Sequence, residues 1–173
     1  LSSVLKSCET AALFVTHDSQ EALAICNRIA VMEQGFIHQF STPQELVSRP
    51  LTPFVGRFVL QRNSLPIHLK NNEYFTPIGK IPLSDSIKLK DVDTIMFDSK
   101  AISISLSSSG NAIVKSSEFC YNHWIVTIMI SNYKLRVWYE KEAKLGIGDK
   151  CEVSFIPNQS ILLFPGSIKT YTA

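Results

Sequence analysis

One histidine in this sequence stands where a fold could use it for chemistry. His17 follows Thr16, and the five residues before Thr16 (Ala-Ala-Leu-Phe-Val, 11–15) are all apolar. A short, wholly apolar run bounded by polar residues predicts a strand over 11–16 that is buried on both faces. Open α/β sheets place their ligand chemistry just beyond the carboxyl ends of such strands. His17 is therefore the candidate for a binding or catalytic side chain.

The residues after His17 predict a helix that holds it in place. Asp18 is of the residue type that caps helix N-termini, and Glu21 stands three positions later. We expect the Asp18 carboxylate to accept from the first turn and Glu21 to accept from the Asp18 N–H, which makes a capping box. The helix is predicted over 18–26, and its inward face carries the apolar side chains Ala22, Leu23, Ile25 and Cys26.

Two further kinds of element are predicted before residue 64. Residues 28–34 and 36–41 form a hairpin, because Gly35 supplies the positive φ that a tight turn requires. Short helices begin at Thr42-Pro43 and Thr52-Pro53, each with an N-cap threonine and a proline at the first helical position. The helical pattern ends at about residues 60–64, so we place a domain boundary there, with domains 1–62 and 63–173.

The second domain has a different pattern. Short β-branched, alternating segments are separated by Asn, Asp, Gly, Pro and Ser, which predicts strands and turns without helices. Many short strands in a small domain are typical of a closed barrel of the OB kind. The expected strands are 93–97, 101–106, 112–115, 124–130, 133–139, 150–156 and 161–164.

These motifs together resemble the end of an ABC transporter ATPase domain, a fold of the P-loop NTPase type. The resemblance rests on Val15-Thr16-His17-Asp18, Gln20-Glu21-Ala22, Arg28 to Met32, Gly35, Ser41 to Leu46, Arg49-Pro50 and Phe54 to Phe58. It implies an α/β end of the ATPase domain followed by an all-β, OB-like accessory (TOBE) domain. It also implies that His17 is the switch histidine, which contacts the γ-phosphate of ATP, with Asp18 and Glu21 as helix-capping support.

The resemblance further points to the importer branch of the family, which serves sugar, polyamine, sulfate and ferric iron. Residues 161–166 (Ile-Leu-Leu-Phe-Pro-Gly) are similar to the terminal strand of the ferric-iron type, so ferric iron is the expected cargo. An Arg-Pro-Glu element of the sugar type is replaced at the corresponding place by Met96 to Ser99. The alternatives are a polyamine or sulfate/molybdate importer ATPase, or a stand-alone OB-type ligand-binding module.

Most of the machinery of ATP hydrolysis is missing from this sequence. It contains no G-x-x-x-x-G-K-[ST] phosphate loop, no apolar run ending in Asp-Glu and no Ser-Gly-Gly signature. In the family all three precede the switch histidine, and the chain starts at Leu1 rather than Met. We expect a C-terminal fragment that is inactive alone and binds no cofactor, whereas its full-length parent would be an ATPase using ATP and Mg²⁺.

The resemblance also implies the partners of the parent and its place in the cell. These are a second copy of the ATPase subunit, membrane permease subunits and, indirectly, a periplasmic substrate-binding protein. The expected location is cytoplasmic, peripheral on the inner face of the plasma (inner) membrane. No apolar run approaches the ~20 residues that span a bilayer. The net charge of +2, with no basic stripe beside the aromatic residues of the second domain, argues against a nucleic-acid partner.

The remaining histidines and the cysteines are not expected to bind metal. His38, His68 and His123 fit no metal-ligand spacing, so we expect solvated strand histidines. Cysteines occur at four scattered positions without a C-x-x-C pair, and we expect them to be reduced packing residues. They are Cys8, Cys26, Cys120 and Cys151.

Overall fold

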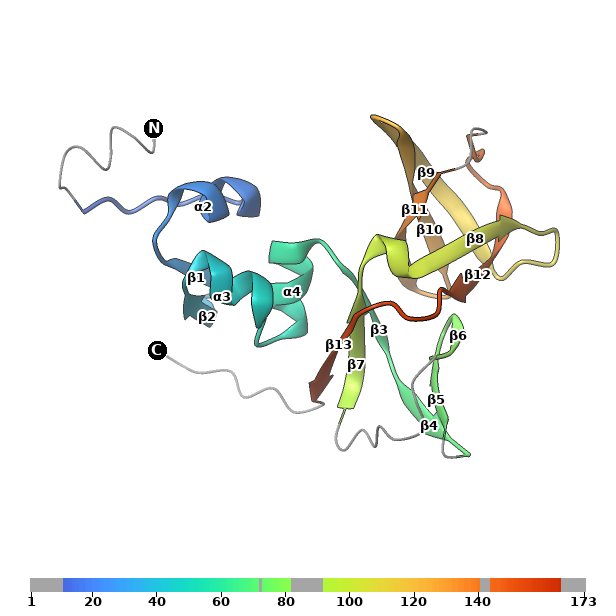
Figure 1. Cartoon of the computed structure of the whole chain (residues 1–173), viewed down its shortest axis with the longest axis horizontal. Coiled ribbons are helices and arrows are strands. Elements are labelled where there is room, and N and C mark those ends of the chain that lie inside the picture. The colour runs from blue at the N-terminus through green and yellow to red at the C-terminus, as the bar shows by residue number, and fades with distance from the viewer. Residues whose placement is uncertain (1–10, 72, 82–91, 141–143, 166–173) are drawn as a thin grey trace. The chain divides into compact units, whose positions relative to one another are not determined.

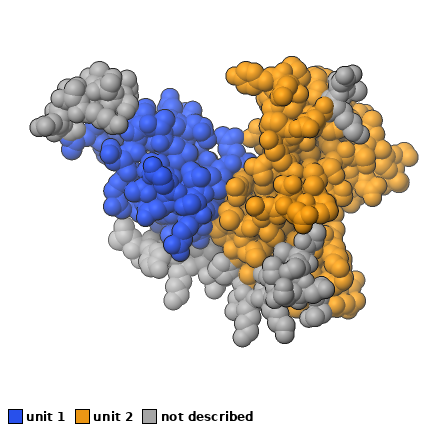
Figure 2. Space-filling model, viewed as in Figure 1, with its two compact units in different colours: residues 1–61, 168–173 blue, residues 62–167 orange. Residues whose placement is uncertain are grey.

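The computed structural model describes residues 11–71, 73–81, 92–140 and 144–165. The chain divides into two compact units, coloured separately in Figure 2. The described residues of unit 1 are 11–61, and those of unit 2 are 62–140 and 144–165, without residues 72 and 82–91. The predicted helix at the N-terminus and Cys8 lie outside the described residues.

The described part of unit 1 contains a hairpin and three short helices, each close to its predicted position (Figure 1). In the hairpin, the turn residues Gln34 and Gly35 both have positive φ, 50° and 85°. The core of this unit consists of Val31, Leu46, Val55 and Val59. The elements are α2 (Ser19–Ile25), β1 (Ile29–Glu33), β2 (Phe36–Ser41), α3 (Pro43–Ser48) and α4 (Pro53–Leu60).

The helix starts in unit 1 are set by side-chain caps. Thr42 and Glu45 form the complete capping box that their spacing predicts at the start of α3. The backbone N–H and the hydroxyl of Thr42 both donate to the Glu45 carboxylate, and these bonds lower the pKa of Glu45. Thr52 Oγ1 accepts from the Val55 N–H at 3.2 Å and caps α4. Local chemistry alone therefore determines where these helices begin.

The strand predicted over 11–16 is wrong for this structure. Residues 11–16 have no regular secondary structure, and the side chains of Leu13 and Val15 are 94% and 87% exposed. A strand of a parallel sheet needs partners for its backbone N–H and C=O groups on both edges. Within the described residues no strand pairs with this segment, so its apolar side chains have nothing to pack against.

Unit 2 is an all-β unit whose described strand pairings are all antiparallel. They make a five-stranded sheet in the order β11-β10-β9-β12-β8 and two three-stranded sheets, β13-β7-β3 and β4-β5-β6. The strands are β3 (Asn63–Pro66), β4 (His68–Lys70), β5 (Glu73–Thr76), β6 (Gly79–Lys80), β7 (Val92–Phe97), β8 (Ile102–Leu106), β9 (Ala112–Cys120), β10 (His123–Ile130), β11 (Tyr133–Tyr139), β12 (Lys150–Phe155) and β13 (Ile161–Pro165), with a 3₁₀ turn η1 (Ser99–Ala101) before β8.

The five-stranded sheet curls toward a barrel without closing through hydrogen bonds. Its edge strands β8 and β11 lie next to each other, but no backbone pairing joins them among the described residues. The inner face is filled with aliphatic side chains from every strand, for example Ile104, Val114, Ile128 and Leu135. The prediction of one closed barrel thus differs from the structure, which divides its strands among three sheets around this core.

A side chain joins two of these sheets in place of a backbone ladder. Asn63, which is buried at the start of β3, makes two hydrogen bonds with the backbone of Arg136 on β11. Its Nδ2 donates to the Arg136 carbonyl and its Oδ1 accepts from the Arg136 N–H, both at 2.7 Å. Because the pair satisfies donor and acceptor together, the position requires a carboxamide.

Gly110 is required where the β8–β9 turn approaches β12. A Cβ at this position would lie 2.3 Å from the Cys151 carbonyl carbon and 2.4 Å from its oxygen, both backbone atoms. We expect Gly110→Ala to destabilise unit 2 by about 2 kcal/mol, because the paired strand cannot move aside cheaply. Thermal unfolding followed by circular dichroism measures this loss.

The matched control is Ser108→Ala in the same turn, at an exposed position with no described hydrogen bond. It should leave the unfolding midpoint nearly unchanged. Equal midpoints for Gly110→Ala and Ser108→Ala would show that the close approach of the turn to β12 does not constrain the fold.

Candidate functional site

The turn that carries His17 is held by hydrogen bonds among its neighbours. The Asp18 carboxylate caps α2, since its Oδ1 accepts from the N–H groups of Gln20 at 2.8 Å and Glu21 at 3.2 Å. Thr16 Oγ1 accepts from the Asp18 N–H at 3.0 Å and donates to Glu21 Oε2 at 3.2 Å. The turn is thus fixed by side chains on both sides of His17.

This network differs in one bond from the predicted capping box. The sequence predicts that Glu21 accepts directly from the Asp18 N–H, but Thr16 Oγ1 accepts that hydrogen bond and Glu21 accepts from the Thr16 hydroxyl instead. The hydroxyl acts as a relay, because it can accept and donate at the same time. Thr16 is a member of the site that sequence reasoning missed. Its signal was its position two residues before the N-cap, as in turns closed by a Thr hydroxyl.

His17 itself projects from this turn with an exposed side chain. Among the described residues it makes no hydrogen bond or ion pair, so both ring nitrogens are available to a ligand. A neutral imidazole carries one donor and one acceptor, and either its N–H or a protonated ring can bond a phosphate oxygen. The described residues also hold no cluster of His, Cys, Asp or Glu that could bind a metal ion.

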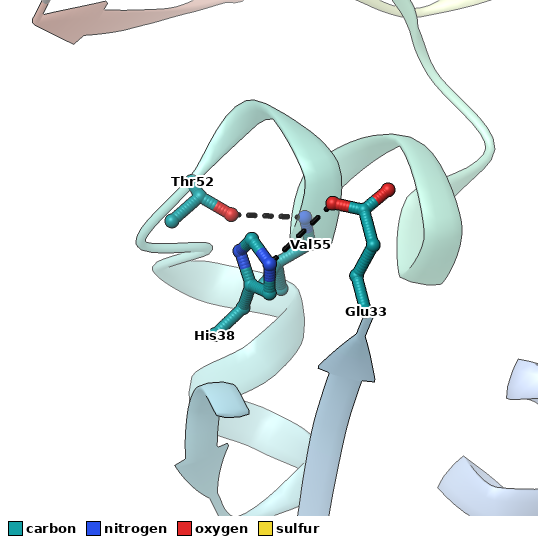
Figure 3. Close-up of polar contacts among 4 residues, drawn as sticks. All are labelled: Glu33, His38, Thr52 and Val55. Atoms are coloured by element: carbon teal, nitrogen blue, oxygen red, sulfur yellow. Dashed lines mark hydrogen bonds and ion pairs between the residues drawn. The ribbon is translucent and has the colours of Figure 1, made fainter. Parts of the chain in front are cut away.

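A second histidine, His38 on β2, is mostly buried and its ring approaches the Glu33 carboxylate (Figure 3). Its side chain is only 12% exposed, its ring lies 4.8 Å from that of Phe54, and its Nε2 lies 3.4 Å from Glu33 Oε2. Its Nδ1 is buried without a hydrogen-bond partner among the described residues. The prediction that His38 is solvated is therefore wrong. The ring fastens the hairpin to α4.

Gln39, next to His38, ties the hairpin to the connection between α3 and α4. Its buried amide donates to Ser41 Oγ at 3.1 Å and to the Arg49 carbonyl at 3.2 Å. Its Oε1 accepts from the Leu51 N–H at 2.9 Å. Two of these three bonds thus satisfy backbone groups, the Arg49 carbonyl and the Leu51 N–H, that no regular element pairs.

Of the histidines in unit 2, His68 is exposed and His123 is buried. His68 on β4 is exposed, as predicted. His123 is buried and stacks on Trp138, with its Nδ1 3.1 Å from Asn122 Oδ1, so the solvated prediction is wrong there. The Lys100 ammonium lies over the Trp138 ring, 4.0 Å from its centroid. These groups form a packed stack.

The described cysteines are free thiols, as predicted. Cys151 is buried, and its Sγ lies 3.7 Å from the Ala112 carbonyl oxygen. Burial, with a smaller contribution from Asp149, raises the pKa of the Cys151 thiol. A raised pKa keeps the thiol protonated and unreactive at neutral pH. Cys26 and Cys120 are partly buried.

Comparison with known proteins shows partial homology to ATP-binding subunits of ABC importers. A sulfate/thiosulfate import ATP-binding protein of Rhizobium meliloti is 46% identical over 70 residues, 39% of this chain and 20% of that protein. A sulfate/thiosulfate import ATP-binding protein of Brucella melitensis is 44% identical over 61 residues, which are 35% of this chain and 17% of that protein. A spermidine/putrescine import ATP-binding protein of Trichormus variabilis is 42% identical over 86 residues, which are 49% of this chain and 23% of that protein.

The matches cover about a fifth of the length of these relatives and less than half of this chain. No family model matches the chain. In addition, none of the helices in its described part has the length and apolar character needed to cross a membrane.

The Asp18 cap provides a test of the His17 turn. We expect Asp18→Ala to fray α2, because two N–H groups of the first turn lose their acceptor at a cost of about 1 kcal/mol. Amide hydrogen exchange of residues 20–25, followed by NMR, measures the effect. Asp18→Asn is the control, since an asparagine oxygen caps equally well. Unchanged exchange in Asp18→Ala would mean that the turn does not depend on this carboxylate.

Proposed function

We propose that this chain is the C-terminal part of the ATP-binding subunit of an ABC importer. The observation that carries the proposal is the sequence identity of over 40%, across 70 and 86 matched residues, to import ATP-binding proteins for two kinds of cargo. The His17 turn supports it, because hydrogen bonds among Thr16, Asp18 and Glu21 hold the backbone turn that carries this exposed histidine. The parent subunit would use ATP and Mg²⁺, and would work with a second ATPase copy and membrane permease subunits.

In this proposal His17 is the switch histidine of the parent. ATP hydrolysis passes through a transition state with charge spread over the γ-phosphoryl oxygens. A donor aimed at those oxygens stabilises that charge, while the phosphate loop and Mg²⁺ ligands of the parent hold the rest of the nucleotide. This chain contributes the histidine alone, so it is proposed to be inactive without the remainder of the parent.

Unit 2 would then be the accessory TOBE-like domain of the importer ATPase. Its antiparallel sheets and its aliphatic core are consistent with such a β-domain. We propose domains 1–62 and 63–173, with the parent bound peripherally on the cytoplasmic face of the membrane beside its permease. A periplasmic substrate-binding protein would deliver the cargo, and no nucleic acid takes part.

For the cargo, the comparisons favour the alternatives over the ferric iron expected from residues 161–166. The relatives named above import sulfate/thiosulfate or spermidine/putrescine, and none of them is a ferric-iron protein. We therefore propose sulfate or thiosulfate as the cargo, with a polyamine second. Uptake of labelled sulfate and labelled spermidine by cells with and without the parent gene separates the two.

The role of His17 is tested in the full-length parent. We expect His17→Ala to bind ATP nearly as well, since the groups that hold the nucleotide lie elsewhere. Its steady-state turnover should fall by ~10²-fold, the scale for losing one electrostatic stabiliser. Nucleotide titration and phosphate release measure the two quantities. Parental turnover in His17→Ala would leave this residue without a catalytic role.

His68→Ala is the matched control, because this histidine is exposed on β4. It should turn over ATP at the parental rate. His38→Ala is unsuitable, because it removes the packing on Phe54 and the contact with Glu33.

The proposed domain boundary is tested by limited proteolysis of this chain. Residues 61 and 62, inside the predicted boundary at 60–64, join α4 to β3 between units that each have their own core, so a protease should cut there first and leave a stable β-fragment. Mass spectrometry of the time course identifies the cut. Gradual loss from both ends with no resistant fragment would contradict two independent domains.

A further inference from the structure

Four outward-facing residues form a row across the five-stranded sheet. In the register of neighbouring strands, Lys150 on β12 pairs with Ile113 on β9, Ile113 with Met129 on β10, and Met129 with Lys134 on β11. Paired residues point to the same face of a sheet. The row therefore places two aliphatic side chains side by side between two lysines.

This row lies on the face opposite the core. The next row, Cys151, Ala112 and Ile130, is buried at 1% exposure or less. Successive residues of a strand alternate between faces, so Lys150, Ile113 and Met129 point away from the core. The burial agrees, since Ile113 and both lysines are exposed and Met129 is partly exposed.

A β-bulge adds a third cation next to the row. Thr127 pairs with Ser116 but Ile128 pairs with Val114, so Lys115 is an extra residue on β9. The bulge keeps Val114 in the core and leaves Lys115 exposed beside Ile113. Bulges commonly re-aim a side chain at functional positions. Among the described residues, no ion pair or side-chain hydrogen bond engages Lys115, Lys134 or Lys150.

We propose that this surface, the Lys115/Lys134/Lys150 face with Ile113 and Met129 at its centre, docks an acidic protein segment. Charge complementarity is the argument: the three uncompensated cations match carboxylates, and the aliphatic pair matches one or two apolar side chains set among them. Glu152, the next outward residue of β12, borders the face with the opposite charge. The partner is an extended acidic peptide with spaced aliphatic residues.

The chemistry of the face favours a peptide over the other anionic partners. Single-stranded nucleic acid binds by stacking its bases on exposed aromatic rings, and the centre of this face is aliphatic. Trp138, on the same face of β11, is already covered by His123 and Lys100. Three lysines and only two apolar side chains also offer little to an anionic membrane, because stable anchoring needs more apolar burial.

The test uses the 173-residue chain and a labelled peptide of about ten residues in which two leucines stand among aspartates and glutamates. Fluorescence anisotropy at low and high salt measures affinity, and NMR amide shifts locate the contact. We expect saturable binding that weakens with salt, with the largest shifts at Ile113, Met129 and their strand neighbours. Shifts confined to other parts of the chain overturn the proposal.

Variants distinguish peptide binding at this face from nonspecific attraction of the acidic peptide to lysines elsewhere on the chain. Lys134→Glu combined with Lys150→Glu should weaken peptide binding by about tenfold or more, and Ile113→Ser should weaken it further. Lys70→Glu and Leu69→Ser on β4 make the same changes at exposed positions of another sheet and should leave affinity unchanged. Equal losses in the control variants overturn the proposal. Should the double charge reversal unfold, Lys134→Gln with Lys150→Gln provides the same comparison.

Competition settles the class of partner. A single-stranded oligonucleotide of equal charge and vesicles rich in anionic lipid are each titrated against the bound peptide. Weak displacement by both supports a protein partner. Displacement by either at lower concentration than unlabelled peptide overturns it in favour of that partner.

Discussion

The constraint on which this structure depends is that every buried strand must find partners for its backbone hydrogen-bonding groups. Unit 2 satisfies it within its own sequence, because hairpins such as β10–β11 bring antiparallel partners together over short turns. Residues 11–16 have the apolar composition of a buried strand, but no described strand pairs with them and their side chains stay exposed. An apolar composition allows a segment to form a buried strand, but the strand forms only where neighbouring strands pair with its backbone.

Where regular pairing ends, side-chain amides take over the same task. Asn63 pairs with both backbone groups of Arg136, and Gln39 satisfies the ends of the α3–α4 connection. A carboxamide suits both positions, because it offers a donor and an acceptor like the peptide group it replaces. Both residues are buried, so loss of either would leave backbone groups unsatisfied away from water, at a cost of about 1–3 kcal/mol for each group.

The features predictable from sequence are those that neighbouring residues determine. The Thr42 capping box, the Gly35 turn and the start of α4 at Pro53 each follow from a few adjacent residues. The assignment of strands to three sheets, and the burial of His38 and His123, depend on contacts between segments far apart in the chain. A residue type and its local alternation carry no information about which ring or strand will cover it.

The His17 turn belongs to the locally determined class, and this bears on its proposed role. Its four hydrogen bonds run between residues 16 and 21, so the turn keeps its shape although the preceding segment is not a strand. If residues 11–16 form a strand in the sheet of a parent protein, that strand therefore has to position a turn that is already formed. Preorganisation of this kind lowers the cost of placing a charge-stabilising group at the moment of reaction. The local bonds thus set the position of the His17 backbone relative to α2, and in the proposed parent its distance from the nucleotide would depend on the sheet that residues 11–16 would join.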